Sequence, residues 1–165
     1  MKRIFRLLLL VALAALGYWL WTVFFPYPER VIRNRIEKAA RLASFAQSDG
    51  NISRIAAIQQ LGTFMADELE LKIDIPNYET HTFTRREELT QAAMGAKGVV
   101  QSLKIDFPDI NVNLAPDKLS ATADVTLRVD VNGQKDAAVQ ELRIYFRKVD
   151  GNWLVYRLDT LRTLH

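Results

Sequence analysis

The segment Leu7–Phe25 constrains this chain more than any other, because it runs for nineteen residues without one charged side chain. A helix of that length spans about 28 Å, close to the hydrocarbon thickness of a bilayer. We therefore expect an uncleaved, single-pass signal anchor. The chain then divides into residues 1–27, a short basic cap with a transmembrane helix, and residues 28–165, a separate domain.

A cleaved signal peptide is the alternative interpretation of the same segment. Ala12-Leu13-Ala14 resembles a small-x-small cleavage site, but only five apolar residues separate it from Arg6. Cleavage there would leave the apolar Trp19–Phe25 on a soluble domain. The aromatic residues near its end suit the far interface of a membrane span: Tyr18, Trp19, Trp21 and Tyr27.

Basic residues lie on both sides of the predicted anchor. Those of Met1–Arg6 favour a cytoplasmic N-terminus at an inner membrane, with the domain exported, and thus periplasmic in a bacterium. The opposing set lies just beyond the anchor, but a long C-terminal domain is translocated largely regardless of charge. This set comprises Arg30, Arg33, Arg35, Lys38 and Arg41. Three of them, Arg30, Arg33 and Arg41, share one helix face with Glu37, and that face contacts either anionic lipid headgroups or solvent, in the second case with internal ion pairs.

The charge of the domain argues against nucleic acid as a partner. The whole chain has a net charge of +3, and the three basic residues of Met1–Arg6 account for it, since acidic residues begin only at Glu29. The domain is therefore neutral and lacks the basic excess of nucleic-acid-binding proteins. Cysteine is absent, which excludes disulfides and thiolate chemistry.

Hydrophobic periodicity predicts two helices, two short strands, a third helix and then a long series of strands. The expected helices cover residues 28–47, 51–67 and 84–103, the last beginning with a capping box, Thr84-Arg85-Arg86-Glu87. Its Gly95 and Gly98 suggest that another backbone passes close by. The expected strands cover residues 68–74, 80–83, 104–114 (interrupted at Pro108-Asp109), 118–131, 135–149 and from 152 to the C-terminal end.

Two hairpins join the last three strands, and each predicts a register. A two-residue loop at Asn132-Gly133 places Ala123 opposite Leu142. At Asp150-Gly151 an odd-length loop places Leu154 opposite Phe146, whereas a two-residue loop would mix apolar and charged faces. The apolar face then comprises Leu119, Ala121, Ala123, Val125, Leu142, Ile144, Phe146, Leu154 and Leu158, with Gln140, Tyr156 and Thr160 as its polar members.

This order of elements resembles the nuclear transport factor 2-like (SnoaL-like) superfamily. The resemblance rests on the helix over residues 84–103, the two hairpins and the terminal Gly151–Val155, and it covers about residues 29–165. It implies an α+β fold in which three helices pack on a curved antiparallel sheet, forming a cone with a cavity. Members of this superfamily include isomerases, hydrolases and scaffold domains, so the fold alone does not choose a function.

No catalytic residue follows from the sequence. The isomerases of the superfamily use a cavity carboxylate, and the predicted cavity face has none. The candidates for contacting a ligand at the cavity mouth are Asp74, Tyr78, His81 and Tyr156, each of which also fits an ordinary structural role. Two histidines are too few for a His-based metal site, and no cofactor motif is present.

The opposite face of the sheet carries basic and aromatic residues of the kinds enriched in protein interfaces. They are Arg128, Arg143, Tyr145, Arg147, Trp153 and Arg157. The alternative is a solvated face with cross-strand ion pairs such as Arg143 with Asp159. We expect a membrane-anchored, non-catalytic scaffold that self-associates or binds a membrane protein through this face. A binding protein for a small apolar or lipid ligand is the alternative, and an isomerase or hydrolase is a third.

Overall fold

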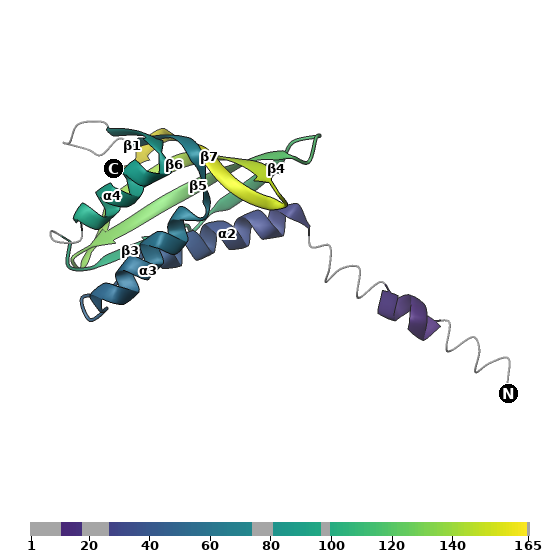
Figure 1. Ribbon diagram of the computed structural model, residues 1–165, viewed down its shortest axis with the longest axis horizontal. Coiled ribbons are helices and arrows are strands. Elements are labelled where there is room, and N and C mark those ends of the chain that lie inside the picture. Colours follow the sequence, from purple (N-terminus) through teal and green to yellow (C-terminus); the bar gives the residue numbers. More distant parts are fainter. Residues whose placement is uncertain (1–10, 18–26, 74–80, 97–99, 165) are drawn as a thin grey trace.

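The computed structural model describes residues 11–17, 27–73, 81–96 and 100–164 (Figure 1). Residues 11–17 are helical, and they are the only part of the predicted anchor within these ranges. Among the described residues, no helix combines the length and the apolar character that a membrane crossing needs. The remainder of Leu7–Phe25 lies outside the described residues.

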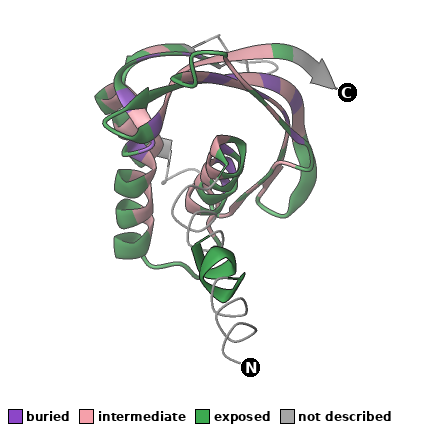
Figure 2. Cartoon of the chain, turned by 90° about the vertical axis from the view of Figure 1, so that its right-hand side faces the viewer, coloured by how far each residue is buried: buried purple, intermediate pink, exposed green. Residues whose placement is uncertain are grey.

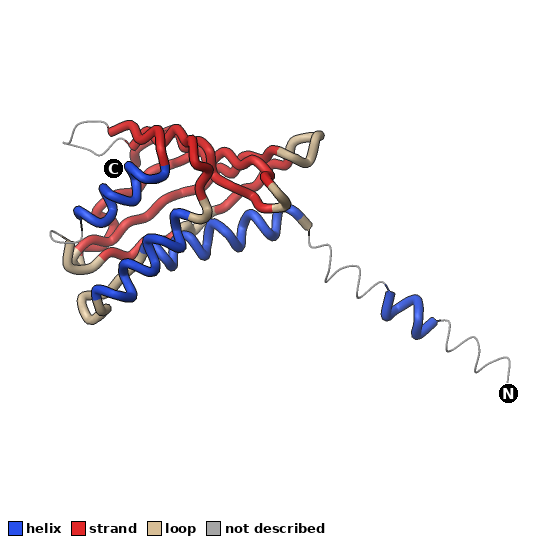
Figure 3. The backbone as a smooth tube through the Cα atoms, in the orientation of Figure 1, coloured by secondary structure: helices blue, strands red, loops and turns tan. Residues whose placement is uncertain are grey.

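Seven strands form one sheet in the order β2-β1-β7-β6-β5-β3, with β4 also paired to β5. Figure 3 shows them as one curved layer with the helices along one side. The strands are β1 (Met65–Ile73), β2 (His81–Arg85), β3 (Leu103–Asp106), β4 (Ile110–Leu114), β5 (Ser120–Val131), β6 (Gln134–Val149) and β7 (Asn152–Leu164).

The sheet is mixed, whereas the sequence predicted an antiparallel one. Strand β1 runs parallel to β7, with Leu71 opposite Leu158. A parallel pair requires a long crossover, and here the whole chain from β2 to β6 lies between the two strands. The predicted interruption at Pro108-Asp109 is confirmed. Strand β3 lies before these two residues and β4 after them, and the two strands pair with successive stretches of β5.

Three helices accompany the sheet: α2 (Pro28–Ala43), α3 (Asn51–Gly62) and α4 (Arg86–Ala96). Helix α2 ends four residues before the predicted Gln47, because Ser44 is extended and Phe45 bridges to Leu103 with N–O distances of 2.7 and 2.9 Å. The Glu88 carboxylate, rather than that of Glu87, accepts a bond from the backbone N–H of Thr84 at the start of α4. The prediction of a close backbone at Gly95 was wrong, since no described atom outside its own helix lies within 4 Å of its Cβ position.

The core lies between α2 and the concave face of the sheet. Figure 2 shows the strands curving around the helix, with buried positions on both the strands and the helix. Ile32 and Ile36 of α2 belong to one cluster with the sheet residues Ala121, Ala123, Val125, Leu142, Ile144 and Phe146. The expected α+β fold with a curved sheet is confirmed at this level. Leu119, predicted on the inner face, is 60% exposed because it precedes β5 in a turn.

The β5–β6 hairpin has the predicted turn but a shifted register. Asn132 and Gly133 have positive φ angles of 51° and 82°, and Val131 pairs with Gln134 across the two-residue loop. A bulge at Asp136 (φ 51°) then moves β6 by two residues, so that Ala123 lies opposite Ile144 instead of Leu142. A shift by two leaves every side chain on its predicted face.

The β6–β7 hairpin differs more from the prediction. Its loop has two residues, because Val149 pairs with Asn152, and the predicted odd-length loop was wrong. A bulge at Tyr156 corrects the faces: Phe146 pairs with Val155 on one side of it and Ile144 with Leu158 on the other. The chain thus accommodates the extra residue inside the strand rather than in the loop.

Candidate functional site

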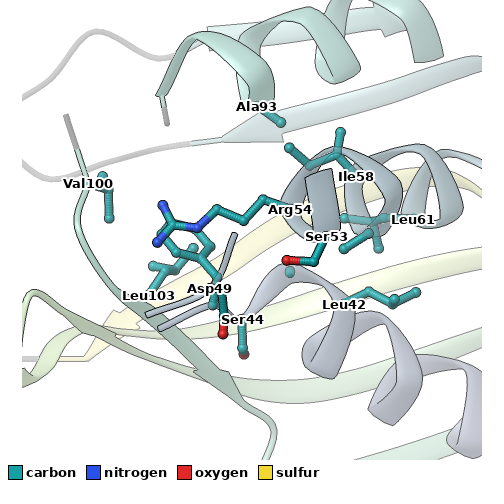
Figure 4. Close-up of a pocket in the computed structure, with 13 residues that line it drawn as sticks. Leu42, Ser44, Asp49, Ser53, Arg54, Ile58, Leu61, Ala93, Val100 and Leu103 are labelled. Atoms are coloured by element: carbon teal, nitrogen blue, oxygen red, sulfur yellow. The ribbon is translucent and has the colours of Figure 1, made fainter. Parts of the chain in front are cut away.

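A pocket of about 410 Å³ opens where the end of α2 and the helices α3 and α4 meet strand β3 (Figure 4). Its volume lies within the range typical of small-molecule sites, about 300–1,000 Å³. The lining is mostly apolar and consists of Leu42, Ala43, Phe45, Ala57, Ile58, Leu61, Ala93, Val100 and Leu103.

Small side chains and an early helix end create this space. Helix α2 stops at Ala43, so the chain turns away before a further helical turn could fill the volume. Ala57 on α3 and Ala93 on α4 face it with single methyl groups. The Phe45–Leu103 bridge ties the end of α2 to strand β3 and fixes that wall.

Two serines line the pocket, and both hydroxyls bond to the backbone. The Ser44 hydroxyl donates to the Ala40 carbonyl at 2.7 Å and accepts from the Ile105 N–H at 2.9 Å. The Ser53 hydroxyl donates to the Gly50 carbonyl at 2.7 Å. Neither is paired with a base, so the pocket lacks the nucleophile–base arrangement of covalent catalysis within the described residues.

The two charged residues of the lining are Asp49 and Arg54. Asp49 is exposed, and its Oδ2 accepts from the Ala46 N–H at 2.8 Å, which closes the turn between α2 and α3. Arg54 is half-buried, and its guanidinium carbon lies 4.5 Å from the centre of the Phe45 ring. Figure 4 shows its side chain extending from α3 toward Val100 and Leu103.

The interior of the cone is filled rather than open. Helix α2 packs directly on the sheet, and a cavity of only about 60 Å³ remains there, beside Phe64, Phe146 and Val155. The pocket therefore lies at the end of α2 and not on the sheet face that the sequence predicted to line a cavity. Among the described residues, no group of histidine, aspartate and glutamate side chains could hold a metal ion.

Of the four cavity-mouth candidates, the structure describes the side chain of Tyr156 alone. Asp74 and Tyr78 lie outside the described residues, and so does the side chain of His81, whose backbone pairs with Ile73 at the start of β2. Tyr156 was predicted on the cavity face, but the bulge turns it to the outer face. There its ring lies 6.1 Å from that of Tyr145 and 5.8 Å from the guanidinium of Arg147.

The outer face of the sheet carries most of the predicted interface residues. Arg143 donates two hydrogen bonds to Asp124, at 2.6 and 3.1 Å, and this pairing raises the pKa of its guanidinium. Asp159, the predicted partner of Arg143, instead accepts from Arg157 at 3.0 Å, which likewise raises the pKa of Arg157. The expected cross-strand pair was therefore wrong in its partner.

The other predicted interface residues divide between surface and core. Arg128 pairs with Asp136 at 3.0 Å on the surface. Arg147 is exposed and forms no ion pair with any described residue. Trp153 is 3% exposed and belongs to the core cluster, so its predicted place on the outer face was wrong. With the two-residue loop, residues 152–155 alternate between the inner and outer faces in the opposite phase to the predicted one.

Sequence reasoning missed the pocket and Arg54 altogether. The pocket depends on where α2 ends and on how three helices meet, which hydrophobic periodicity does not encode. One signal was present in the sequence. The aromatic Phe45 and the cationic Arg54 lie on either side of the Asp49-Gly50 break, so a turn there can bring the guanidinium over the ring.

No protein-family model matches the sequence, and no curated protein matches it. Solved structures do match. A nuclear transport factor 2-like protein from Pseudomonas putida is 18% identical, with a TM-score of 0.59 over 80% of this chain and 84% of that one. A protein with a cystatin-like fold from Caulobacter vibrioides is 15% identical, with a TM-score of 0.61 over 82% and 89%. The yeast UBP3-associated protein BRE5 is also 15% identical, with a TM-score of 0.60 over 81% and 94%.

These likenesses show the fold. The chain has the nuclear transport factor 2-like architecture that the order of its elements predicted, and it shares this architecture with proteins described as having a cystatin-like fold. At such identities the matches carry no activity, ligand or partner across to this chain.

Proposed function

We propose that this chain is a non-catalytic binding protein for a small apolar or amphiphilic molecule. The observation that carries the proposal is the apolar pocket of about 410 Å³ at the junction of α2, α3, α4 and β3. A soluble domain gains stability by filling such space, and here small side chains leave it open. Binding is favoured over reaction because the hydroxyls of Ser44 and Ser53 and the carboxylate of Asp49 are engaged in backbone hydrogen bonds.

Filling the pocket with a large side chain tests this proposal. Ala57→Trp places an indole in the pocket, and Ala56→Trp is the matched control, because Ala56 is the exposed neighbour on the same helix. Native mass spectrometry of the full-length chain should show a co-purified small molecule on the wild type and on the control, and none on Ala57→Trp. The same bound mass on all three proteins, or none on any, would contradict the proposal.

The scaffold hypothesis is the second candidate, and the outer face of the sheet favours it. Tyr145, Tyr156 and the exposed Arg147 lie together there, and tyrosine and arginine are enriched in binding hot spots. Trp153 does not contribute to this surface, since it is buried.

If the chain pairs through this face, Arg147→Glu should convert a dimer to a monomer in analytical ultracentrifugation, while Arg41→Glu on α2 should not. A wild-type monomer at high concentration would contradict the hypothesis.

Membrane anchoring by Leu7–Phe25 is part of the proposal and rests on the sequence. A single apolar span would hold the domain at the inner membrane, with its N-terminus cytoplasmic and the domain in the periplasm. Alkaline phosphatase fused after His165 should then be active in a bacterial host, because the enzyme needs an oxidising compartment to form its disulfides. An inactive fusion with intact expression would overturn the exported orientation.

A further inference from the structure

We infer that the ligand of this pocket carries one anionic head, a carboxylate, which the guanidinium of Arg54 binds while the apolar remainder lies against Ala57, Ile58 and Leu61. The inference rests on the proposed function and adds the chemical class of the ligand. It begins from the position of Arg54, the one cation among the described lining residues, most of which are apolar.

The guanidinium of Arg54 has hydrogen-bonding capacity left over. Its Nη2 donates to the carbonyl of Ala46 at 2.5 Å and, more weakly, to that of Gln101 at 3.4 Å. Within the described part of the chain, Nη1 has no acceptor, and Nε is buried without one. These two backbone bonds and the Phe45 ring hold the group in one orientation, so an incoming anion meets a donor that is already positioned.

The charge of Arg54 is also left without a partner. No carboxylate of the described residues lies within ion-pair distance of it. Asp49, the other charged residue of the lining, is directed to the Ala46 N–H instead. A partly buried cation of this kind is destabilised by the loss of water, and an anion that enters the pocket offsets that cost.

The start of α3 adds a second positive contribution. Its first turn has no acidic residue and no side-chain cap, and Ser53 of that turn lines the pocket. The free N–H groups at a helix start attract negative charge. Because the described residues of the lining supply one full positive charge, a monoanion fits better than a phosphate dianion. The planar carboxylate matches the geometry of a guanidinium donor.

Decanoate and decanol test the inference, because they share an alkyl chain and differ in the charged head. Each is titrated by equilibrium dialysis into the full-length chain in lipid nanodiscs, with empty nanodiscs as the blank. The wild type should bind decanoate at least about tenfold more tightly than decanol, as expected for a hydrogen bond to a charged group. Arg54→Gln should reduce decanoate binding to the level of decanol and leave decanol binding unchanged.

Two further variants complete the test. Arg54→Lys should retain most of the preference for decanoate, and Arg41→Gln, which removes an exposed cation from the last turn of α2, should retain all of it. Equal binding of decanoate and decanol to the wild type, both lost in Ala57→Trp, would overturn the inference and leave the proposed function standing. Equal weakening of both ligands in Arg54→Gln would also overturn it. Binding of neither ligand above the blank would overturn the inference and the proposed function together.

Discussion

Trp153 contributes to stability rather than to recognition. It faces the interior from β7, in the same cluster as Phe146 and Ile32, and only 3% of its surface is exposed. The amine of Lys148 lies 5.8 Å from the centre of the ring, over the edge of the core. A large aromatic side chain in this position contributes mainly through the apolar area that it buries.

Replacing Trp153 by alanine should therefore lower the free energy of unfolding by about 3–5 kcal/mol, the usual cost of removing a large buried aromatic residue. Tyr156→Ala is the comparison, since that ring lies on the outer face, and its loss should cost clearly less. Urea unfolding of the full-length chain measures both values. A Trp153→Ala variant of nearly wild-type stability would show that the side chain is not in the core.

Asp117 gives the turn before β5 a dependence on pH. Its carboxylate accepts from the backbone N–H groups of Leu119 and Ser120, at 2.8 and 3.1 Å, and also from the Ser120 hydroxyl. These bonds, that of Leu119 first, lower the pKa of Asp117 below its ordinary value of 3.8. Because the folded state favours the ionised form, this stabilisation is full well above that value and is lost as the pH falls through the lowered pKa.

Asp117→Asn should consequently be less stable than the wild type at pH 7, and the difference should shrink as the pH falls below 3.8. Unfolding in urea, repeated at several pH values, measures the difference. A gap that stays constant down to the acid limit would contradict the proposed role of the carboxylate.

At the scale of the elements, the sequence predicted the order and type of almost every helix and strand. Alternation and turn residues encode these locally, and the turn at Asn132-Gly133 is an example. The bulges at Asp136 and Tyr156 were missed. The first shifts the register by two residues and leaves the alternation of faces intact, and the phase change at the second was assigned to the loop instead. Placing the extra residue in the β6–β7 loop rather than at Tyr156 misplaced both Trp153 and Tyr156.

The pocket was beyond sequence reasoning for a related reason. It depends on where α2 ends and on the packing of α3 against α4, where Gly62 lies 3.6 Å, measured from its Cβ position, from the Thr90 hydroxyl. Contacts of this kind join residues that are far apart in the chain, and no local pattern reports them. Ala57, Ile58 and Leu61 of α3 border this space, and their periodicity does not indicate it.

Two glycines show how local conformation decides stability. Gly133 has a φ of 82° in the β5–β6 turn, so Gly133→Ala should destabilise the fold by roughly 1 kcal/mol. Gly95 lies in α4 with open space around its Cβ position, so Gly95→Ala should stabilise by about 0.5–1 kcal/mol. Thermal unfolding of both variants tests the pair, and changes of the same sign would contradict the assignment.

At the scale of the whole molecule, α2 links the N-terminal segment to the pocket. Tyr27 precedes the helix, the pocket lies at its other end, and sixteen residues separate them by about 24 Å. If the proposed anchor holds the chain in a membrane, the pocket opens well away from the point of attachment unless α2 lies along the surface. The orientation of α2 would thus decide whether a ligand comes from the bilayer or from the aqueous side.

Methyl NMR spectroscopy of the full-length chain in nanodiscs tests the central claim most directly, namely that the pocket between α2, α3, α4 and β3 binds a small apolar ligand. With labelled isoleucine, leucine and valine methyl groups and added decanoate, signals of Ile58, Leu61 and Leu103 should shift, whereas those of the core residues Ile32 and Val125 should not. Ala57→Trp should abolish the shifts. Shifts that persist in that variant, or that spread evenly over the core, would contradict the account.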